Sequence, residues 1–296
     1  MRKGRKKFPY VRDNRYFCNK KLERETITMK KTIFWLVLSA VTMGLTACAG
    51  QKEKVDEKAR RGWGLVWEDD FEKSPFTENW SMTPRNKKSP VYRYMSQNEG
   101  LYVSQEGNLV LRAMGNSVSN DTLPFLTGGI NRPAFKAGTI NRIEVRARVN
   151  TAEGAVPYLS LVPTDATGNI SIDFMERYEL DEFIYQSVTS EYTTTQGMPD
   201  NPPSSALVGV NPLQYHTYAV ETYADSLLFF VDEIRTKKYP RILTDIPGQF
   251  PFNDHDFDLF IGIRLNKDTD PAGLPADLFI DWVRYYEPQK PVVVNN

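Results

Sequence analysis

Short segments of alternating polarity recur along this chain, and no long amphipathic helical pattern separates them. Residues 140–149 alternate apolar and charged side chains over ten positions. That pattern is typical of a strand with one face on a core and one on solvent. Hairpin patterns occupy 101–113 and 218–232, and residues 257–263 and 278–286 indicate two further strands. Strands at this spacing predict an all-β domain, an antiparallel sandwich or a barrel.

The N-terminal region has a different character. Residues 29–47 combine a basic start with a short apolar run, and Leu45-Thr46-Ala47-Cys48 follows the pattern of a bacterial lipobox. We interpret 29–47 as a lipoprotein signal peptide, after which Cys48 is lipidated. The apolar run is too short and too interrupted for the ~20 residues of a membrane-spanning helix. The basic residues 1–28 precede a good start codon and are interpreted as a mis-assigned leader.

Residues 48–62 are polar and charged, which predicts a flexible tether between a lipid and a folded domain. Lipid on Cys48 would hold the protein at a membrane. The prediction is an exported lipoprotein on the periplasmic face or the cell surface. Residues 63–288 fit one β domain, followed by a tail at 289–296.

Charge and cysteine content limit which partners and which disulfides can be expected. The chain has 37 basic and 37 acidic residues, so it gives no electrostatic reason to expect nucleic acid as a partner. Both cysteines lie upstream of the β domain, which is therefore expected to have no disulfide. Aromatic residues make up 12% of the chain and suit either a sugar-binding groove or a sandwich core. We expect a monomer.

The segment Ser171-Ile172-Asp173-Phe174-Met175-Glu176 carries two carboxylates in a strand-like setting. Residues 171 and 173 share one face because a strand repeats every two residues, whereas 176 has the opposite parity. One β-bulge between 173 and 176 would return Glu176 to the face of Asp173. The spacing therefore places Ser171 and Asp173 on one face of a sheet, and Glu176 joins them only if the strand has such a bulge.

The order of motifs around this segment resembles glycoside hydrolase family 16, the family of laminarinases and carrageenases. The flanking motifs are Leu65-Val66-Trp67-Glu68-Asp69-Asp70-Phe71, Thr127-Gly128-Gly129-Ile130, Ile143-Glu144-Val145-Arg146-Ala147-Arg148, Tyr215-His216-Thr217-Tyr218-Ala219-Val220-Glu221 and Ile280-Asp281-Trp282-Val283-Arg284-Tyr285-Tyr286. The resemblance implies a concanavalin- or laminarinase-like jelly roll, which is a two-sheet antiparallel β-sandwich with a glycan groove on its concave face.

The family's catalytic strand is Glu-x-Asp-x-x-Glu, in which the first Glu attacks the sugar, the Asp orients it and the last Glu protonates the leaving oxygen. By position, the resemblance implies an acid/base role for Glu176, an orienting role for Asp173, and Ser171 in place of the nucleophile. A retaining glycosidase needs two carboxyl groups about 5–5.5 Å apart. A serine with no base beside it is a poor nucleophile, so hydrolysis is expected to be lost or slow.

The resemblance also implies roles around the groove. Ser160 stands where the family's Trp-Pro-Ala-Phe-Trp motif ends in a sugar-stacking Trp, and Tyr158 and Tyr178 are either a replacement platform or core aromatics. His216 matches a family histidine near the cleft and is expected to contact a subsite at most. Asp281 matches the terminal strand that often holds a structural calcium. No dense ligand loop accompanies it, so no cofactor is expected to be required.

Three functions remain open at this point. The first is a lipoprotein that binds a β-linked polysaccharide or oligosaccharide with weak or no retaining hydrolysis. The second is a working endo-glycosidase that uses Glu176 with a different nucleophile or with water. The third is a structural or protein-binding sandwich, which predicts that no open groove is present.

Overall fold

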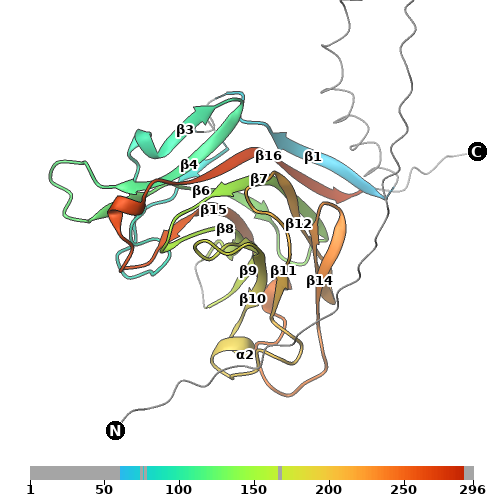
Figure 1. Cartoon of the computed structure of the whole chain (residues 1–296). Helices are drawn as coiled ribbons and strands as arrows, with labels where there is room; N and C mark the ends of the chain where they lie inside the picture. The colour runs from blue at the N-terminus through green and yellow to red at the C-terminus, as the bar shows by residue number, and fades with distance from the viewer. Residues whose placement is uncertain (1–60, 74–75, 77–78, 166–168, 290–296) are drawn as a thin grey trace, which may run out of the picture. The chain divides into compact units, whose positions relative to one another are not determined.

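The computed structural model describes residues 61–73, 76, 79–165 and 169–289, which build two antiparallel sheets (Figure 1). Within these residues the first sheet has nine strands: β3 (Tyr102–Gln105), β4 (Asn108–Gly115), β16 (Ala276–Pro288), β7 (Asn141–Asn150), β12 (His216–Thr222), β13 (Ser226–Val231) and β14 (Ile234–Pro240), with β1 (Trp63–Asp69) on β16 and β5 (Phe125–Thr127) on β4. The second has seven: β11 (Ser205–Val208), β10 (Ile184–Thr189), β9 (Ser171–Glu176), β8 (Ala155–Pro163), β15 (Phe257–Leu265), β6 (Gly129–Phe135) and β2 (Ser81–Met82).

Helical structure in these residues is short. The single α-helix described, α2 (Glu191–Thr194), begins in a capping box in which Ser190 and Thr193 bond to each other's backbone N–H groups. The 3-10 turns are η1 (Glu99–Leu101), η2 (Pro251–Asn253) and η3 (Pro271–Gly273). None of the helices described is long and apolar enough to cross a membrane.

The core lies between the two sheets. Alternate residues of β7, such as Val145 and Ala147, pack in one buried cluster with Leu159 and Leu161 of β8. Each of these four side chains is fully buried. The two-sheet antiparallel sandwich predicted from the strand pattern and the family resemblance is confirmed.

One expectation about β7 is wrong. Its charged face was predicted to lie in solvent, but the side chains of Arg142 and Glu144 are each only 2% exposed. Arg142 donates to Glu144 and to Glu221 of the neighbouring β12, both at 2.6 Å, and to Glu233 at 3.0 Å. Buried charges persist when they are paired in this way. Polarity alternation therefore identified the strand but not the burial of its polar face.

The predictions for the leader, the signal peptide, Cys48 and most of the tether fall on residues 1–60, outside the described residues. Residues 290–296 of the predicted tail also lie outside them. Among described residues, β1 begins at Trp63 and β16 ends at Pro288, and these two residues pair with each other.

Candidate active-site cleft

A cleft of about 1280 Å³ lies against the seven-stranded sheet. Side chains of β8, β9, β10 and β15 form one part of its lining, and the loop 83–92 after β2 forms another. Along β8, Leu159 and Leu161 belong to the core cluster, whereas Tyr158 and Ser160 line the cleft. The two-residue repeat of the strand thus separates core from cleft.

The predicted β-bulge in β9 is present. Asp173 is level with Ser160 on β8 and Ser187 on β10, and Glu176 is level with Tyr158 and Tyr185 on the same two strands. Between these two levels β8 and β10 each advance by two residues, whereas β9 advances by three. The extra residue in β9 is what a bulge produces. As a result Ser171, Asp173 and Glu176 all line the cleft.

Asp173 is the most heavily hydrogen-bonded group of the cleft. The hydroxyl of Ser160 donates to Oδ1 at 2.6 Å, and the hydroxyls of Ser171 and Ser187 approach Oδ2 at 2.6 and 3.4 Å. Burial raises the pKa of Asp173, and these three hydroxyl bonds oppose that rise. Asp173 is thus a buried carboxylate held in place from three adjacent strands.

Glu176 lies beside this cluster. Burial and the negative charge of Asp173 raise its pKa to about 7, while Ser187, Arg264 and Tyr178 oppose the shift. Ser187 Oγ is 3.1 Å from Glu176 Oε2, and Tyr178 donates to Oε1 at 3.4 Å. Because a hydroxyl carries one proton, Ser187 can accept from protonated Glu176 while it donates to Asp173. Glu176 is therefore suited to give up a proton near neutral pH.

Ser171 differs from the sequence-based expectation in one respect, because it does have a base beside it. Its hydroxyl donates to Asp173 at 2.6 Å. Asp173 also accepts from Ser160, so it serves as the shared acceptor of this group. Among the described residues, the carboxylates that line the cleft are Asp173, Glu176 and Asp258, and the last accepts a hydrogen bond from Thr164 at 2.9 Å.

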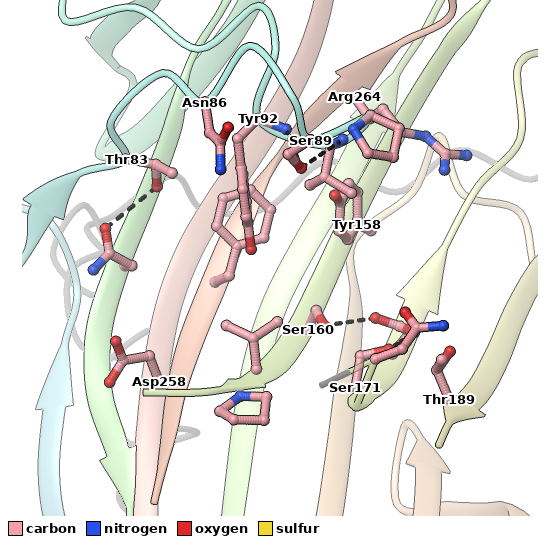
Figure 2. A pocket seen from close by; sticks show the side chains of 18 of the residues that line it. Thr83, Asn86, Ser89, Tyr92, Tyr158, Ser160, Ser171, Thr189, Asp258 and Arg264 are labelled. Carbon is pink, nitrogen blue, oxygen red and sulfur yellow. Dashed lines mark hydrogen bonds between the residues drawn. The ribbon is translucent and has the colours of Figure 1, made fainter. Parts of the chain in front are cut away.

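Part of the aromatic lining of the cleft comes from a loop, which the strand pattern does not reveal. Tyr92, on the loop after β2, meets Phe260 edge-on with 5.1 Å between ring centroids, and the ring centroid of Tyr158 lies 5.2 Å from that of Phe260. Figure 2 labels Tyr92 and Tyr158 among the side chains that line the cleft. Phe260 is level with Ser160 across β15 and β8. An aromatic wall therefore stands beside Ser160 even though that residue has no ring.

The electrostatic setting of Tyr92 places it close to the carboxylates. Its pKa is raised to about 12 by burial and by the charges of Asp173 and Asp258. Sequence analysis missed Tyr92 because it lies in a loop without periodicity.

Of the two predicted tyrosines, Tyr158 is buried with no hydrogen-bond partner for its hydroxyl in the described part of the chain. Tyr178 is 37% exposed and meets Tyr185 edge-on.

The structure does not bring His216 to this group. It lies at the start of β12 in the other sheet, where Nδ1 is 2.6 Å from Asp232 Oδ2 and Nε2 is 3.1 Å from the carbonyl oxygen of Asn211. Its absence from the cleft lining leaves the predicted subsite role without support. Bonds to the loop before β12 and to the turn after β13 instead indicate a structural histidine.

Asp281 has an ion-pair partner of its own. Its carboxylate accepts from Arg146 on the neighbouring β7. In the part of the chain that the structure describes, no group of three or more His, Cys, Asp or Glu side chains is placed to hold a metal. A calcium role for Asp281 therefore finds no support in its surroundings, where an arginine already balances its charge.

Comparisons with known proteins agree with this architecture. No family model matches the sequence. The chain is 24% identical over 291 residues to the keratan-sulfate endo-1,4-beta-galactosidase of Sphingobacterium multivorum, covering 88% of this chain and 68% of that protein. It is 24% identical over 294 residues to the beta-glucanase of Rhodothermus marinus, covering 91% and 98%.

Solved structures superimpose on this fold. SCLam, a non-specific endo-beta-1,3(4)-glucanase from family GH16, superimposes with a TM-score of 0.64 at 18% identity, over 77% of this chain and 92% of that one. The described chain thus has the fold of the family 16 glucanases, as its motif order predicts.

Proposed function

We propose that this protein binds a β-linked polysaccharide or oligosaccharide in the cleft and has little or no retaining hydrolysis. The observation that carries the proposal is the β9 strand, which presents Ser171, Asp173 and Glu176 to an open cleft. The names of two relatives, a beta-glucanase and an endo-1,4-beta-galactosidase, specify β-linked glycans. A cleft with polar groups beside an aromatic wall suits such a ligand.

The chemistry of Ser171 is the reason to expect weak hydrolysis. A carboxylate nucleophile forms a glycosyl ester, which water then cleaves. A serine would instead form an ordinary alkyl glycoside, whose second cleavage is as difficult as that of the substrate. Asp173 can accept the serine proton, but this does not improve the leaving group in the second step. Turnover through Ser171 is therefore unfavourable even with a base beside it.

A working hydrolase is the second candidate, and the pKa of Glu176 favours it. A carboxyl group with a pKa of about 7 is a competent general acid near neutral pH. In that case Asp173 would activate water in place of a protein nucleophile. One hydroxyl, Ser187 Oγ, reaches both carboxylates at 3.1 and 3.4 Å. The two carboxylate oxygens that it reaches, Glu176 Oε2 and Asp173 Oδ2, can therefore be no farther apart than the sum of these two distances. That separation is at or below the lower end of the roughly 6.5–9.5 Å typical of inverting enzymes.

The third candidate, a structural or protein-binding sandwich, predicts a closed face on this sheet. The cleft of about 1280 Å³ argues against it.

As to location, we propose an exported lipoprotein anchored through Cys48, on the strength of the lipobox at residues 45–48. Incorporation of labelled fatty acid into the wild-type chain, but not into Cys48→Ala, would support the anchor, and equal labelling would contradict it.

One experiment separates the three candidates. The purified domain is incubated with laminarin, mixed-linkage glucan, agarose and carrageenan, while affinity and released reducing ends are both measured. We expect affinity for at least one glycan without reducing ends. Reducing ends that disappear in Glu176→Gln would show a working hydrolase. Absence of affinity for every glycan would overturn both carbohydrate functions.

A further inference from the structure

We propose that Gln186 is a positioning residue, which holds the bulge of β9 and thereby keeps Glu176 on the cleft face. Gln186 lies on β10 between Tyr185 and Ser187, which pair with Glu176 and Asp173 of β9. It is therefore the residue of β10 that stands opposite the bulge. The inference rests on the function proposed above only where it concerns glycan affinity, because the state of Glu176 can be measured without a ligand.

The extra residue of the bulge is Phe174. Across β8 and β9 the pairing passes from Met175 directly to Asp173, so Phe174 is skipped in the register. Its side chain is fully buried in the core cluster. A bulge disrupts the ladder at such a residue, and a buried carbonyl oxygen then needs a donor from elsewhere. The Nε2 atom of Gln186 supplies one, donating to the Phe174 carbonyl oxygen at 3.2 Å.

The other end of the Gln186 amide is fixed from the opposite sheet. Thr236 on β14 approaches Gln186 Oε1 at 2.6 Å through its hydroxyl, which is closer than the 3.2 Å to the Phe229 carbonyl oxygen. β14 belongs to the nine-stranded sheet and contacts β11, the edge of the seven-stranded one (Figure 1). The next residue, Lys237, donates to the Pro203 carbonyl oxygen just before β11. The bulge is thus tied through one side chain to the sheet across the core.

An amide is suited to both contacts at once. The Phe174 carbonyl oxygen can only accept and the Thr236 hydroxyl donates, so the side chain between them needs one donor and one acceptor. Glutamine has both, whereas an ionised glutamate would face the carbonyl oxygen with a second acceptor. Gln186 is 0% exposed, and a buried amide without partners would cost free energy. A glutamine among the core side chains is therefore explained by the bulge that it stabilises.

The consequence for the cleft follows from strand parity. Without the extra residue, positions 173 and 176 point to opposite faces of the sheet. Glu176 would then be directed at the apolar core cluster and away from Ser187 Oγ, which now lies 3.1 Å from its Oε2. Because burial of a carboxylate there is costly, the end of β9 would loosen and expose Glu176 to water. Gln186 acts through the β9 backbone and is not among the described residues that line the cleft.

The test removes each contact while it keeps the size of the side chain. Gln186→Met deletes the amide, Thr236→Val deletes the hydroxyl, and Thr236→Ser is the conservative variant that retains it. In each full chain the ionisation of Glu176 is followed by NMR of isotopically labelled glutamate, with the signal assigned by its loss in Glu176→Gln. Affinity for laminarin, mixed-linkage glucan, agarose and carrageenan and the urea midpoint are measured in parallel.

A second buried glutamine provides the matched control. Gln249 is 6% exposed and also bonds to the backbone, donating to the Pro240 carbonyl oxygen and accepting from the Ile242 N–H. None of these three described residues lines the cleft. Gln249→Met therefore removes an equally buried amide at a distance from the bulge, and it reports what general loss of stability does to the cleft.

We expect Gln186→Met to lower the pKa of Glu176 from about 7 by roughly one unit or more, because burial is the largest cause of its elevation and a loosened strand admits water. Glycan affinity should fall about tenfold. Thr236→Val should shift both in the same direction, and Thr236→Ser should restore them. Gln249→Met should lower the urea midpoint and move neither.

An unmoved titration of Glu176 in both Gln186→Met and Thr236→Val would refute the positioning role, even if both variants are less stable. Equal pKa shifts in Gln249→Met would refute it as well, since general loss of stability would then explain them. If wild type binds none of the four polymers, the proposed function fails, but the titration of Glu176 still decides the role of Gln186. Should Gln186→Met not fold, Thr236→Val decides alone, because it leaves the glutamine in place.

Discussion

Replacing Glu176 with Gln should stabilise the protein at alkaline pH and slightly destabilise it at acid pH. Burial and Asp173 raise the pKa of Glu176 from 4.5 to about 7. The folded state therefore keeps a proton that the unfolded chain releases between these two values. Because the unfolded state then binds fewer protons, stability falls as pH rises through this window. At about 1.4 kcal/mol per pKa unit, ionisation of Glu176 costs about 3 kcal/mol above pH 7.

A neutral glutamine avoids this ionisation but weakens hydrogen bonds to Ser187 and Tyr178, which costs about 1 kcal/mol at any pH. Urea unfolding followed by tryptophan fluorescence at pH 4.5 and pH 8 measures both effects. The free energy of unfolding of Glu176→Gln relative to wild type should rise by about 2–3 kcal/mol between the two pH values. Glu182→Gln, at an exposed position, is the control and should show no such rise. An identical difference at both pH values would refute the account of Glu176.

Three further predictions concern the cleft and its surroundings. Ser171→Glu should release reducing ends with retention of configuration, observed by NMR of the first anomer, and adding Glu176→Gln should abolish this; an inactive Ser171→Glu would mean that more than the nucleophile is missing. Tyr92→Ala should weaken glycan affinity roughly tenfold by calorimetry, because it removes an aromatic face from the wall; unchanged affinity would exclude stacking there. Calcium or a chelator should leave the urea midpoint unchanged, because Arg146 already balances Asp281; a clear shift would contradict that assignment.

Local patterns were sufficient to predict several of the strands, and the family motif added the bulge. The hairpin expected over residues 101–113 is formed by β3 and β4, and the one over 218–232 by β12 and β13. The bulge in β9 was predicted from the family motif together with the two-residue repeat of a strand, since Asp173 and Glu176 cannot otherwise share a face. These features depend on neighbours in sequence, so a single chain was enough to find them.

Features that depend on distant segments were not predictable. Nothing near Tyr92 in the sequence indicates that its loop would meet Phe260, about 170 residues later. The burial of Arg142 requires carboxylates from β12 and from the turn at Glu233, and a strand pattern cannot supply that information. The position of His216 away from the cleft was not predictable for the same reason, because only the sheet arrangement shows that β12 lies in the other sheet.

The serines of the cleft are best understood together. A glutamate at 171 would set a second negative charge beside buried Asp173, so that the pair would share a proton or need a cation. With serine at 160 and 171, Asp173 instead accepts a 2.6 Å hydrogen bond on each oxygen. A tryptophan at 160 would place a large ring here in place of the small hydroxyl that donates to Asp173. The two positions that depart from the family pattern therefore complete one hydrogen-bonded site, which satisfies a buried carboxylate and leaves Glu176 as the titrating group that lines the cleft.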